Sequence, residues 1–351
     1  MMGEAYLAGG ALVAAALAYG ACGWVRRTGV LDAPDGARKL QNAPVPSSGG
    51  VGFVPAAFVA WIAPLTAHAI LKGFPALDLG RSLAANWSAV WGLTAFALVL
   101  GWLDDLGRAP TVLKFALLAL ASLAVSASGV AASSVPTPFG HGHLPVLAAV
   151  AGSALWLFVV MNAVNFMDGA NGLSMGGLGV MLVSLGAAAW LTHPDVFALP
   201  VWAFAGALGG FLIWNLPGRL YAGDAGALAG GALFAAASLW LVSRGAFSVW
   251  TPATLALPFL VDVFLTLWAR ARRGENLLVA HRDHAYQRLI DSGWSHLRTA
   301  RLYWGFSLFC GLSALIAMSG GDILSFTVFW ALTAVGSALW LAAPEAASTP
   351  D

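Results

Sequence analysis

Residues 86–131 read NWSAVWGLTAFALVLGWLDDLGRAPTVLKFALLALASLAVSASGVA and contain two apolar runs joined by a short polar turn. Each run is roughly 20 residues long, the length that an α-helix needs to cross a bilayer. The turn and its edges carry Asp104, Asp105, Arg108 and Lys114. The stretch therefore predicts two transmembrane helices with a charged connection at one membrane face.

Similar apolar runs fill the rest of the chain. Of its 351 residues, 59% are hydrophobic and 9% are charged, whereas a soluble domain carries about 25% charged residues. We therefore expect an all-α, polytopic transmembrane helix bundle of 10–11 spans, formed as one integral membrane domain over residues 1–351. Eleven spans are predicted at 4–24, 50–71, 86–103, 112–131, 145–165, 173–192, 197–214, 225–243, 251–269, 302–319 and 323–342.

The basic residues sort onto one side of this topology. With the C-terminus in the cytoplasm, all of the 17 basic residues lie on the inside except Lys72, Arg81 and Arg244. This is the partition that the positive-inside rule describes, and it places the N-terminus on the opposite side. A formal net charge of +1 gives no reason to expect a nucleic-acid partner. Cys22 and Cys310 both fall in apolar runs, so neither a disulfide nor a metal framework is expected.

Four polar motifs fall at the predicted inside face. In the first, Asp104 and Asp105 close one span and Lys114 opens the next. Adjacent carboxylates at a membrane interface are costly unless they are solvated, paired or bound to a cation. They are either a solvated helix end, or a general base or Mg²⁺ site beside a phosphate-binding lysine.

The second motif is MNAVNFMDGANGLS at residues 161–174. Asn162, Asn165 and Asp168 are three residues apart, so they lie near one helix face. They predict a hydrogen-bonding wall for a ligand. Helix capping explains Asp168 but leaves the two asparagines unexplained.

The third motif joins Asn215, in a Trp-Asn-Leu-Pro helix end, to Gly223-Asp224-Ala225-Gly226 at the next helix start. A helix start with small residues presents free N–H groups to an anion. Asp224 either caps this helix or holds a metal that bridges phosphates.

The longest inside loop contains His281-Arg282-Asp283-His284, with His296 further on. Arginine and histidine suit recognition of a diphosphate, and metal binding by the histidines is the less favoured alternative. The first inside loop holds Arg38 before a proline-rich stretch that ends in Gly49-Gly50.

Taken in chain order, with the Arg38 loop first, the motifs resemble the polyprenyl-phosphate N-acetylhexosamine-1-phosphate transferases of the bacterial inner membrane. The resemblance implies that undecaprenyl phosphate attacks the β-phosphorus of a UDP-N-acetylhexosamine and that UMP leaves. It implies that Asp224, with Asp105, holds Mg²⁺ or Mn²⁺ and that Asp104 or Asp105 acts on the lipid phosphate. It also implies a substrate-binding set of Lys114, Asn162, Asn165, Asp168, Asn215, Arg38, His281, Arg282 and His284.

The last loop departs from the peptidoglycan branch of this family, which has consecutive histidines where this chain reads His284-Ala285-Tyr286-Gln287. It favours the branch that initiates O-antigen or other surface polysaccharides. The alternatives are phospho-N-acetylmuramoyl-pentapeptide transferase and, in another class, an ion-coupled secondary transporter. The expected partners are the two substrates and membrane lipids, and a homodimer is one state that the sequence allows.

Overall fold

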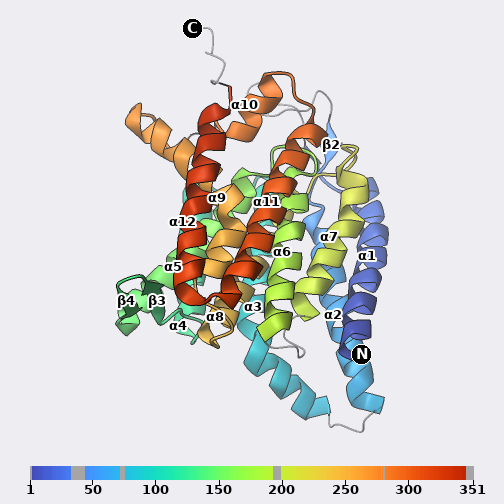
Figure 1. Cartoon of the computed structure of the whole chain (residues 1–351). Helices are drawn as coiled ribbons and strands as arrows, with labels where there is room; N and C mark the ends of the chain where they lie inside the picture. The colour runs from blue at the N-terminus through green and yellow to red at the C-terminus, as the bar shows by residue number, and fades with distance from the viewer. Residues whose placement is uncertain are drawn as a thin grey trace.

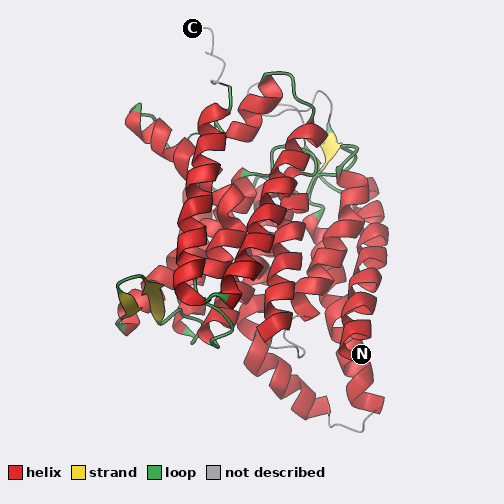
Figure 2. Ribbon diagram, viewed as in Figure 1, coloured by secondary structure: helices red, strands yellow, loops and turns green. Residues whose placement is uncertain are grey.

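The chain folds into a bundle of long helices that run roughly side by side (Figure 1). The structure, a computed structural model, describes residues 2–32, 44–71, 76–192, 199–277, 279 and 281–344. Over these residues it contains twelve helices and two antiparallel sheets of two strands each (Figure 2). The elements are α1 (Met2–Thr28), β1 (Leu31–Asp32), β2 (Val45–Pro46), α2 (Gly50–Leu71), α3 (Ala76–Asp105), α4 (Thr111–Ala127), β3 (Ser134–Thr137), β4 (Gly140–His143), α5 (Val146–Phe166), α6 (Leu173–Thr192), α7 (Leu199–Asn215), α8 (Gly223–Ser243), α9 (Trp250–Arg272), α10 (Ala285–Asp291), α11 (His296–Ser319) and α12 (Gly321–Ala342).

Every helix except α10 corresponds in order to one of the predicted spans. Eight of the described helices are long and apolar enough to cross a membrane, and two shorter apolar helices, Thr111–Ala127 and Pro200–Asn215, accompany them. The predicted all-α polytopic membrane bundle is confirmed, and α6 and α7 are separate helices. The count of eleven crossings stays a prediction.

Three parts of the fold differ from the sequence prediction. Helices α3 and α11 begin at Ala76 and His296, several residues before the predicted 86 and 302, because their first turns are too polar for a hydropathy pattern to reveal. The Ser295 side chain caps α11 by accepting the N–H of Arg298 at 3.2 Å. The short helix α10 and the hairpins β1–β2 and β3–β4 were not predicted.

Helix α8 lies at the centre of the bundle and packs against α2, α3, α5 and α6. In its apolar segment Gly223–Ser243, 94% of the residues are buried, compared with 17% in α12 at the periphery. The helix is rich in glycine and alanine, and small side chains let neighbouring helices approach closely in a membrane. This central helix therefore fixes where the surrounding helix ends meet.

Two glycines bring α2 and α3 against the first turn of α8. A Cβ atom on Gly50 would lie 2.3 Å from the Gly226 nitrogen, and one on Gly101 would lie 2.4 Å from the Asp224 carbonyl oxygen. Neither position has room for a larger side chain, because the obstacle is backbone. These contacts place the beginning of α2 and the end of α3 beside Asp224.

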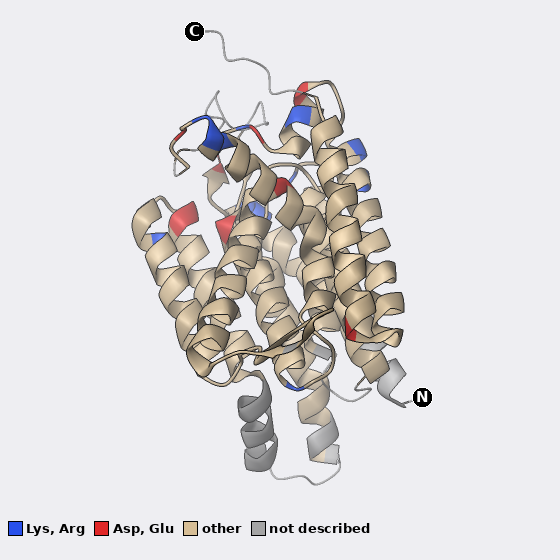
Figure 3. Ribbon diagram, turned by 60° about the vertical axis from the view of Figure 1, so that its left-hand side comes forward, with Lys and Arg blue, Asp and Glu red and all other residues tan. Residues whose placement is uncertain are grey.

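Most of the charged positions lie towards one end of the bundle (Figure 3). This end carries the C-termini of α3, α5 and α7, the N-termini of α4 and α8, and α10 (Figure 1). Arg244 caps the opposite end of α8, as the partition predicted, whereas the side chains of Lys72 and Arg81 fall outside the described residues. Cys22 and Cys310 are free and buried.

Candidate active site

A lysine between two carboxylates forms the centre of the charged end. The Lys114 Nζ atom lies 2.5 Å from Asp104 Oδ2 and 2.7 Å from Asp224 Oδ2. Lys114 comes from the first turn of α4, Asp104 from the last turn of α3, and Asp224 from the first turn of α8. Lys114 is buried and the two carboxylates are partly exposed. The motif residues of α3, α4 and α8 thus meet in one cluster at the charged end of the bundle.

Asp105 faces away from this cluster and holds the start of α8. Its Oδ1 atom accepts the N–H of Asp224 at 2.8 Å, and its Oδ2 atom accepts the N–H of Ala225 at 3.4 Å and the hydroxyl of Ser48 at 2.8 Å. The N-cap position of α8 is Ala222, which has no side chain able to cap. Asp105 from a neighbouring helix therefore satisfies N–H groups that an N-terminal turn leaves free.

This arrangement excludes the interpretation that Asp224 of the Gly-Asp-x-Gly motif caps α8. Asp224 does not cap α8, because its own N–H is taken by Asp105 while its carboxylate bonds Lys114. Ser48 was not singled out from the sequence. It has a positive φ of 66° directly before the Gly49-Gly50 pair, and that pair was the only signal that could have pointed to it.

The end of α5 supplies the next side of the site. The Asn165 side chain lies beside the Asp224 carboxylate, and Asp168 accepts a hydrogen bond from Ser174. Burial raises the pKa of Asp168 to about 8; the Ser174 hydrogen bond opposes this shift, and the charges of Asp224 and Asp105 add to it. Asn162 instead donates to the Phe158 carbonyl at 2.7 Å within its own helix. In this structure the predicted wall thus contains Asn165 and Asp168.

Asn215 lies behind the turn that follows Asp168. Its Oδ1 atom accepts the N–H of Gly172 at 2.7 Å, and its Nδ2 atom donates to the Leu220 carbonyl at 3.0 Å. The Gly172 carbonyl also accepts from Trp304 Nε1 at 2.9 Å. Gly172 has a φ of 77°, which favours glycine. Asn215 thus clamps two loops together and orients the turn that holds Asp168.

The last loop is anchored by a buried acid, Asp262 of α9. Its carboxylate accepts the N–H groups of Ala285 at 2.9 Å and Tyr286 at 3.3 Å, and the hydroxyl of Tyr303 at 2.5 Å. It also contacts His284 Nδ1 at 3.2 Å. The Arg270 side chain, near the end of the same helix, pairs instead with Glu275 at 2.7 Å and Asp283 at 3.4 Å. Tyr303 was missed because it lies in an apolar span without a motif.

Short helix α10 brings the histidines towards the Asp168 turn. The Tyr286 hydroxyl donates to the Phe166 carbonyl at 3.2 Å, and the His281 and His284 rings lie 4.9 Å apart, tilted by 32°. Burial lowers the pKa of His281 to about 4, and the neighbouring His284 and Arg270 charges add to this shift. His281 is therefore neutral at physiological pH.

Two predicted residues stand apart from this cluster. Arg282 is paired with Asp291 at the surface, and its Nε atom is buried without a hydrogen-bond partner among the described residues. Arg38 lies outside the described residues, so its role stays a prediction.

The carboxylates of the cluster could serve as ligands of a Mg²⁺ ion. The described residues contain no group of three or more His, Cys, Asp or Glu side chains arranged to hold a metal. Mg²⁺ is commonly held by one or two carboxylates together with substrate phosphates. Asp224 and Asp104, which interact with each other as well as with Lys114, meet that smaller requirement. Both oxygens of Asp105 are already engaged by N–H and O–H donors.

The helix bundle and this cluster define a class: a polytopic membrane protein whose carboxylates, lysine and buried histidine loop meet at one end. Residues 87–242 match the family model described as glycosyl transferase family 4. Over this stretch the chain is similar to that family, and this similarity favours a glycosyl-1-phosphate transferase over the transporter alternative.

Curated relatives match over most of the chain. A decaprenyl-phosphate N-acetylglucosaminephosphotransferase of Mycolicibacterium smegmatis is 29% identical, over 88% of this chain and 80% of the relative. A phospho-N-acetylmuramoyl-pentapeptide-transferase of Synechococcus is 29% identical, over 76% and 77%. A probable undecaprenyl-phosphate N-acetylglucosaminyl 1-phosphate transferase of Bacillus subtilis is 25% identical, over 87% and 82%.

Proposed function

We propose that the protein transfers N-acetylglucosamine 1-phosphate from UDP-N-acetylglucosamine to a polyprenyl phosphate such as undecaprenyl phosphate. An oxygen of the lipid phosphate forms a bond to the β-phosphorus, the bond from that phosphorus to the bridging oxygen breaks, and UMP leaves. The Lys114 cluster with Asp104 and Asp224 is the observation that carries this proposal. The names of the mycobacterial and Bacillus relatives support the sugar and the lipid.

The residues of the cluster suit phosphoryl transfer, which depends on positioning and on charge neutralisation. Lys114 supplies a cation close to two acids, so an incoming phosphate competes with the carboxylates for its N–H groups. Asp104 is the candidate to orient or deprotonate the lipid phosphate, because it is partly exposed and belongs to the cluster. Asp105 positions Asp224 through the α8 backbone.

We also propose a requirement for Mg²⁺, with Asp224 as its main ligand and Asp104 beside it. When bound, the ion neutralises charge on the diphosphate. Asn165 lies beside Asp224 and is proposed to orient it, and Asp168 is proposed to lie on the nucleotide side of the site. In the last loop, His284 is held by Asp262, and Arg282 is the cation proposed to contact the diphosphate.

The name of the Synechococcus relative supports a second candidate function, the transfer of phospho-N-acetylmuramoyl-pentapeptide. The last loop favours the smaller sugar, because Ala285 and Tyr286 are buried against Asp262 and the Asp168 turn. Neither side chain is available for the role that a histidine has in the peptidoglycan branch. Initiation of O-antigen or another envelope polysaccharide is the pathway that we propose for the product.

The test is a UMP-release assay on purified protein with polyprenyl phosphate and a panel of UDP-sugars. UDP-N-acetylglucosamine should give the fastest release, which should stop when Mg²⁺ is chelated. Asp224→Asn should lose most turnover without unfolding, and Asp322→Asn, an acid at the other end of the bundle, should release UMP at the wild-type rate. Release only with the muramoyl-pentapeptide nucleotide would select the second candidate, and no release with any sugar would refute the proposal.

The proposed site faces the cytoplasm of the bacterial inner membrane, with the N-terminus periplasmic and the C-terminus cytoplasmic. Cysteines introduced at Arg108, Arg219 and Arg282 should be shielded from an impermeant thiol reagent in intact cells, and one at Arg244 should react. The two native cysteines are buried, so background labelling should be low. Labelling at position 282 without labelling at position 244 would reverse the orientation.

A further inference from the structure

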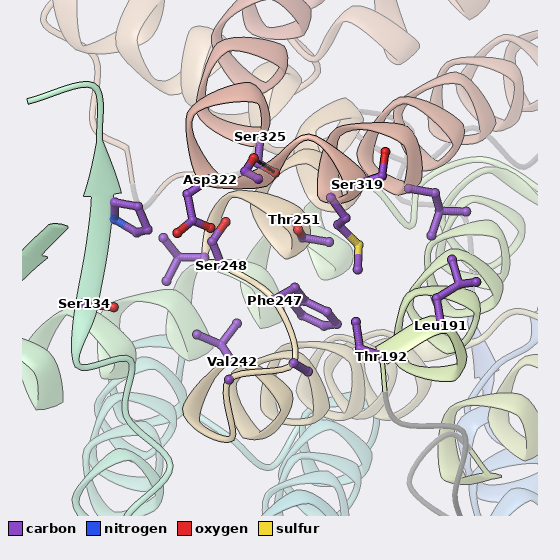
Figure 4. Close-up of a pocket in the computed structure, with 17 residues that line it drawn as sticks. Ser134, Leu191, Thr192, Val242, Phe247, Ser248, Thr251, Ser319, Asp322 and Ser325 are labelled. Carbon is purple, nitrogen blue, oxygen red and sulfur yellow. Dashed lines mark hydrogen bonds between the residues drawn. The ribbon is translucent and has the colours of Figure 1, made fainter. Parts of the chain in front are cut away.

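A cavity lies at the end of the bundle opposite the candidate active site. It has a volume of about 610 Å³ and lies between β3, the end of α6, the α8–α9 loop, the end of α11 and the start of α12 (Figure 4). Helix α8 begins beside the Lys114 cluster and ends at this cavity. Its 21 residues at 1.5 Å each span about 30 Å. The cavity is therefore no part of the transferase site.

The floor of this cavity is polar. Asp322 and Ser325 of α12 line it together with Ser248 and Thr251, and Figure 4 shows the Asp322 carboxylate beside the Ser248 hydroxyl. The hydroxyl oxygens of Ser248 and Thr251 are buried and have no hydrogen-bond partner among the described residues. Thr251 is only 1% exposed. Buried polar groups are normally hydrogen-bonded, so these two indicate that a ligand completes the site.

The charge of the lining selects the kind of ligand. The described lining residues include one acid, Asp322, and no lysine, arginine or histidine. Asp322 already interacts with another group of the chain, and the ligand would be a further partner of its carboxylate. An ammonium group brings three N–H donors and no acceptor, which complements a carboxylate and two hydroxyl oxygens. A single carboxylate is too few for Ca²⁺, and an anionic head group would be repelled.

Apolar side chains also line the cavity and cover the outer surface of the helices around it. Leu191 lines the cavity and is 68% exposed, and Ile316 and Ile323, on the two helices that form one wall, are 68% and 60% exposed. Leu315 and Met318 continue the apolar wall inward. In a membrane such a surface contacts acyl chains. A ligand with an ammonium head and a hydrocarbon tail fits both parts of the site.

We propose that this cavity binds an aminophospholipid, with its primary ammonium group on Asp322, Ser248 and Thr251 and an acyl chain along Leu191, Leu315 and Met318. With the orientation proposed above, the lipid belongs to the outer leaflet. The site is independent of the transfer reaction, so its test does not depend on the sugar or on the polyprenyl substrate.

The test is native mass spectrometry of the detergent-purified protein titrated with phosphatidylethanolamine, phosphatidylcholine and phosphatidylglycerol of identical acyl chains. Phosphatidylethanolamine should bind about tenfold more tightly than the other two, because a charge-assisted hydrogen bond is lost with each of them. Asp322→Asn should remove that preference. Thr251→Val should weaken it, whereas Thr327→Val should not, because Thr327 is exposed on α12 and bonds the Ile323 carbonyl at 2.8 Å.

Thermal unfolding of each variant confirms that it is folded, and Thr251→Val with Ser248→Ala replaces Asp322→Asn if the latter fails to fold. Equal binding of the three lipids would overturn the proposal, and so would an unchanged preference in Asp322→Asn. Displacement of phosphatidylethanolamine by free ethanolamine at the same concentration would overturn the lipid assignment, because it would show that the acyl chain contributes nothing.

Discussion

The Asp105→Asn substitution keeps the size of the side chain that holds α8 and removes one acceptor oxygen. In the least costly orientation, the amide oxygen keeps the 2.8 Å contact with the Asp224 N–H. The amide N–H₂ then faces Ser48, whose hydroxyl can accept instead of donate. The N–H of Ala225, 3.4 Å from Oδ2 in the native protein, is left facing a donor.

Two costs add in this variant. Loss of a negative charge at a helix N-terminus costs about 0.3–1 kcal/mol, and a buried N–H without a partner costs about 1–3 kcal/mol. We therefore expect the free energy of unfolding to fall by about 1–4 kcal/mol. Asp104→Asn is the matched control: it loses one ion pair whose carboxylate is 23% exposed, and Lys114 keeps its second ion pair with Asp224 at 2.7 Å.

Thermal unfolding in detergent and steady-state UMP release separate the two roles. Asp105→Asn should lower Tm by several degrees, and Asp104→Asn should leave Tm nearly unchanged. Asp104→Asn should lower kcat with little change in KM for the UDP-sugar, because a group that acts in the chemical step adds little to substrate binding. Equal Tm values for both variants, or a less stable Asp104→Asn, would refute the assignment of Asp105 as the residue that positions α8.

Three further predictions use the same assays. Gly50→Ala should lower Tm and turnover, because its Cβ would meet the α8 backbone at 2.3 Å and overpacking costs about 1–3 kcal/mol; Gly92→Ala, with open space around it, is the neutral control. Arg282→Ala should raise KM for the UDP-sugar about tenfold or more, and an equal effect of Asp291→Asn would show that Arg282 serves only its ion pair. The pKa of Asp168 is raised to about 8 in the folded protein, so the wild type should lose stability as pH rises from about 4 to 8, because the unfolded chain releases this proton more readily than the folded protein does. Asp168→Asn has no such proton and should therefore become more stable relative to wild type over that range. A constant difference in Tm between the two proteins would contradict this.

The membrane fold was predictable because its signals are local. Each apolar run specifies a helix without reference to the rest of the chain, and the basic residues at helix ends show which ends share a face. The same assignment of helix ends to one face predicted that Asp104, Lys114 and Asp224 lie at the same end of the bundle. The resemblance to a transferase family came from the order of the motifs.

The contacts that shape the site were not predictable from such local patterns. Asp105 bonds the backbone of Asp224, 119 residues away, and Asp262 bonds Ala285 and Tyr303, 23 and 41 residues away. Hydropathy shows that Asp262 lies within a span but says nothing about which backbone N–H groups it will receive. The aminophospholipid cavity is likewise formed by five segments, none of which carries a recognisable motif.

Asp105 and Asp262 have the same structural role on two sides of the site. Each is a carboxylate from one helix that accepts consecutive backbone N–H groups at the start of another, Asp105 for α8 and Asp262 for α10. Each thereby places a side chain proposed to meet substrate, Asp224 in one case and His284 in the other. A site built from helix ends and loops can therefore be as well ordered as one built within a helix, because buried charge-assisted hydrogen bonds fix its backbone. Substitutions at these two acids should disturb position first and chemistry only as a consequence.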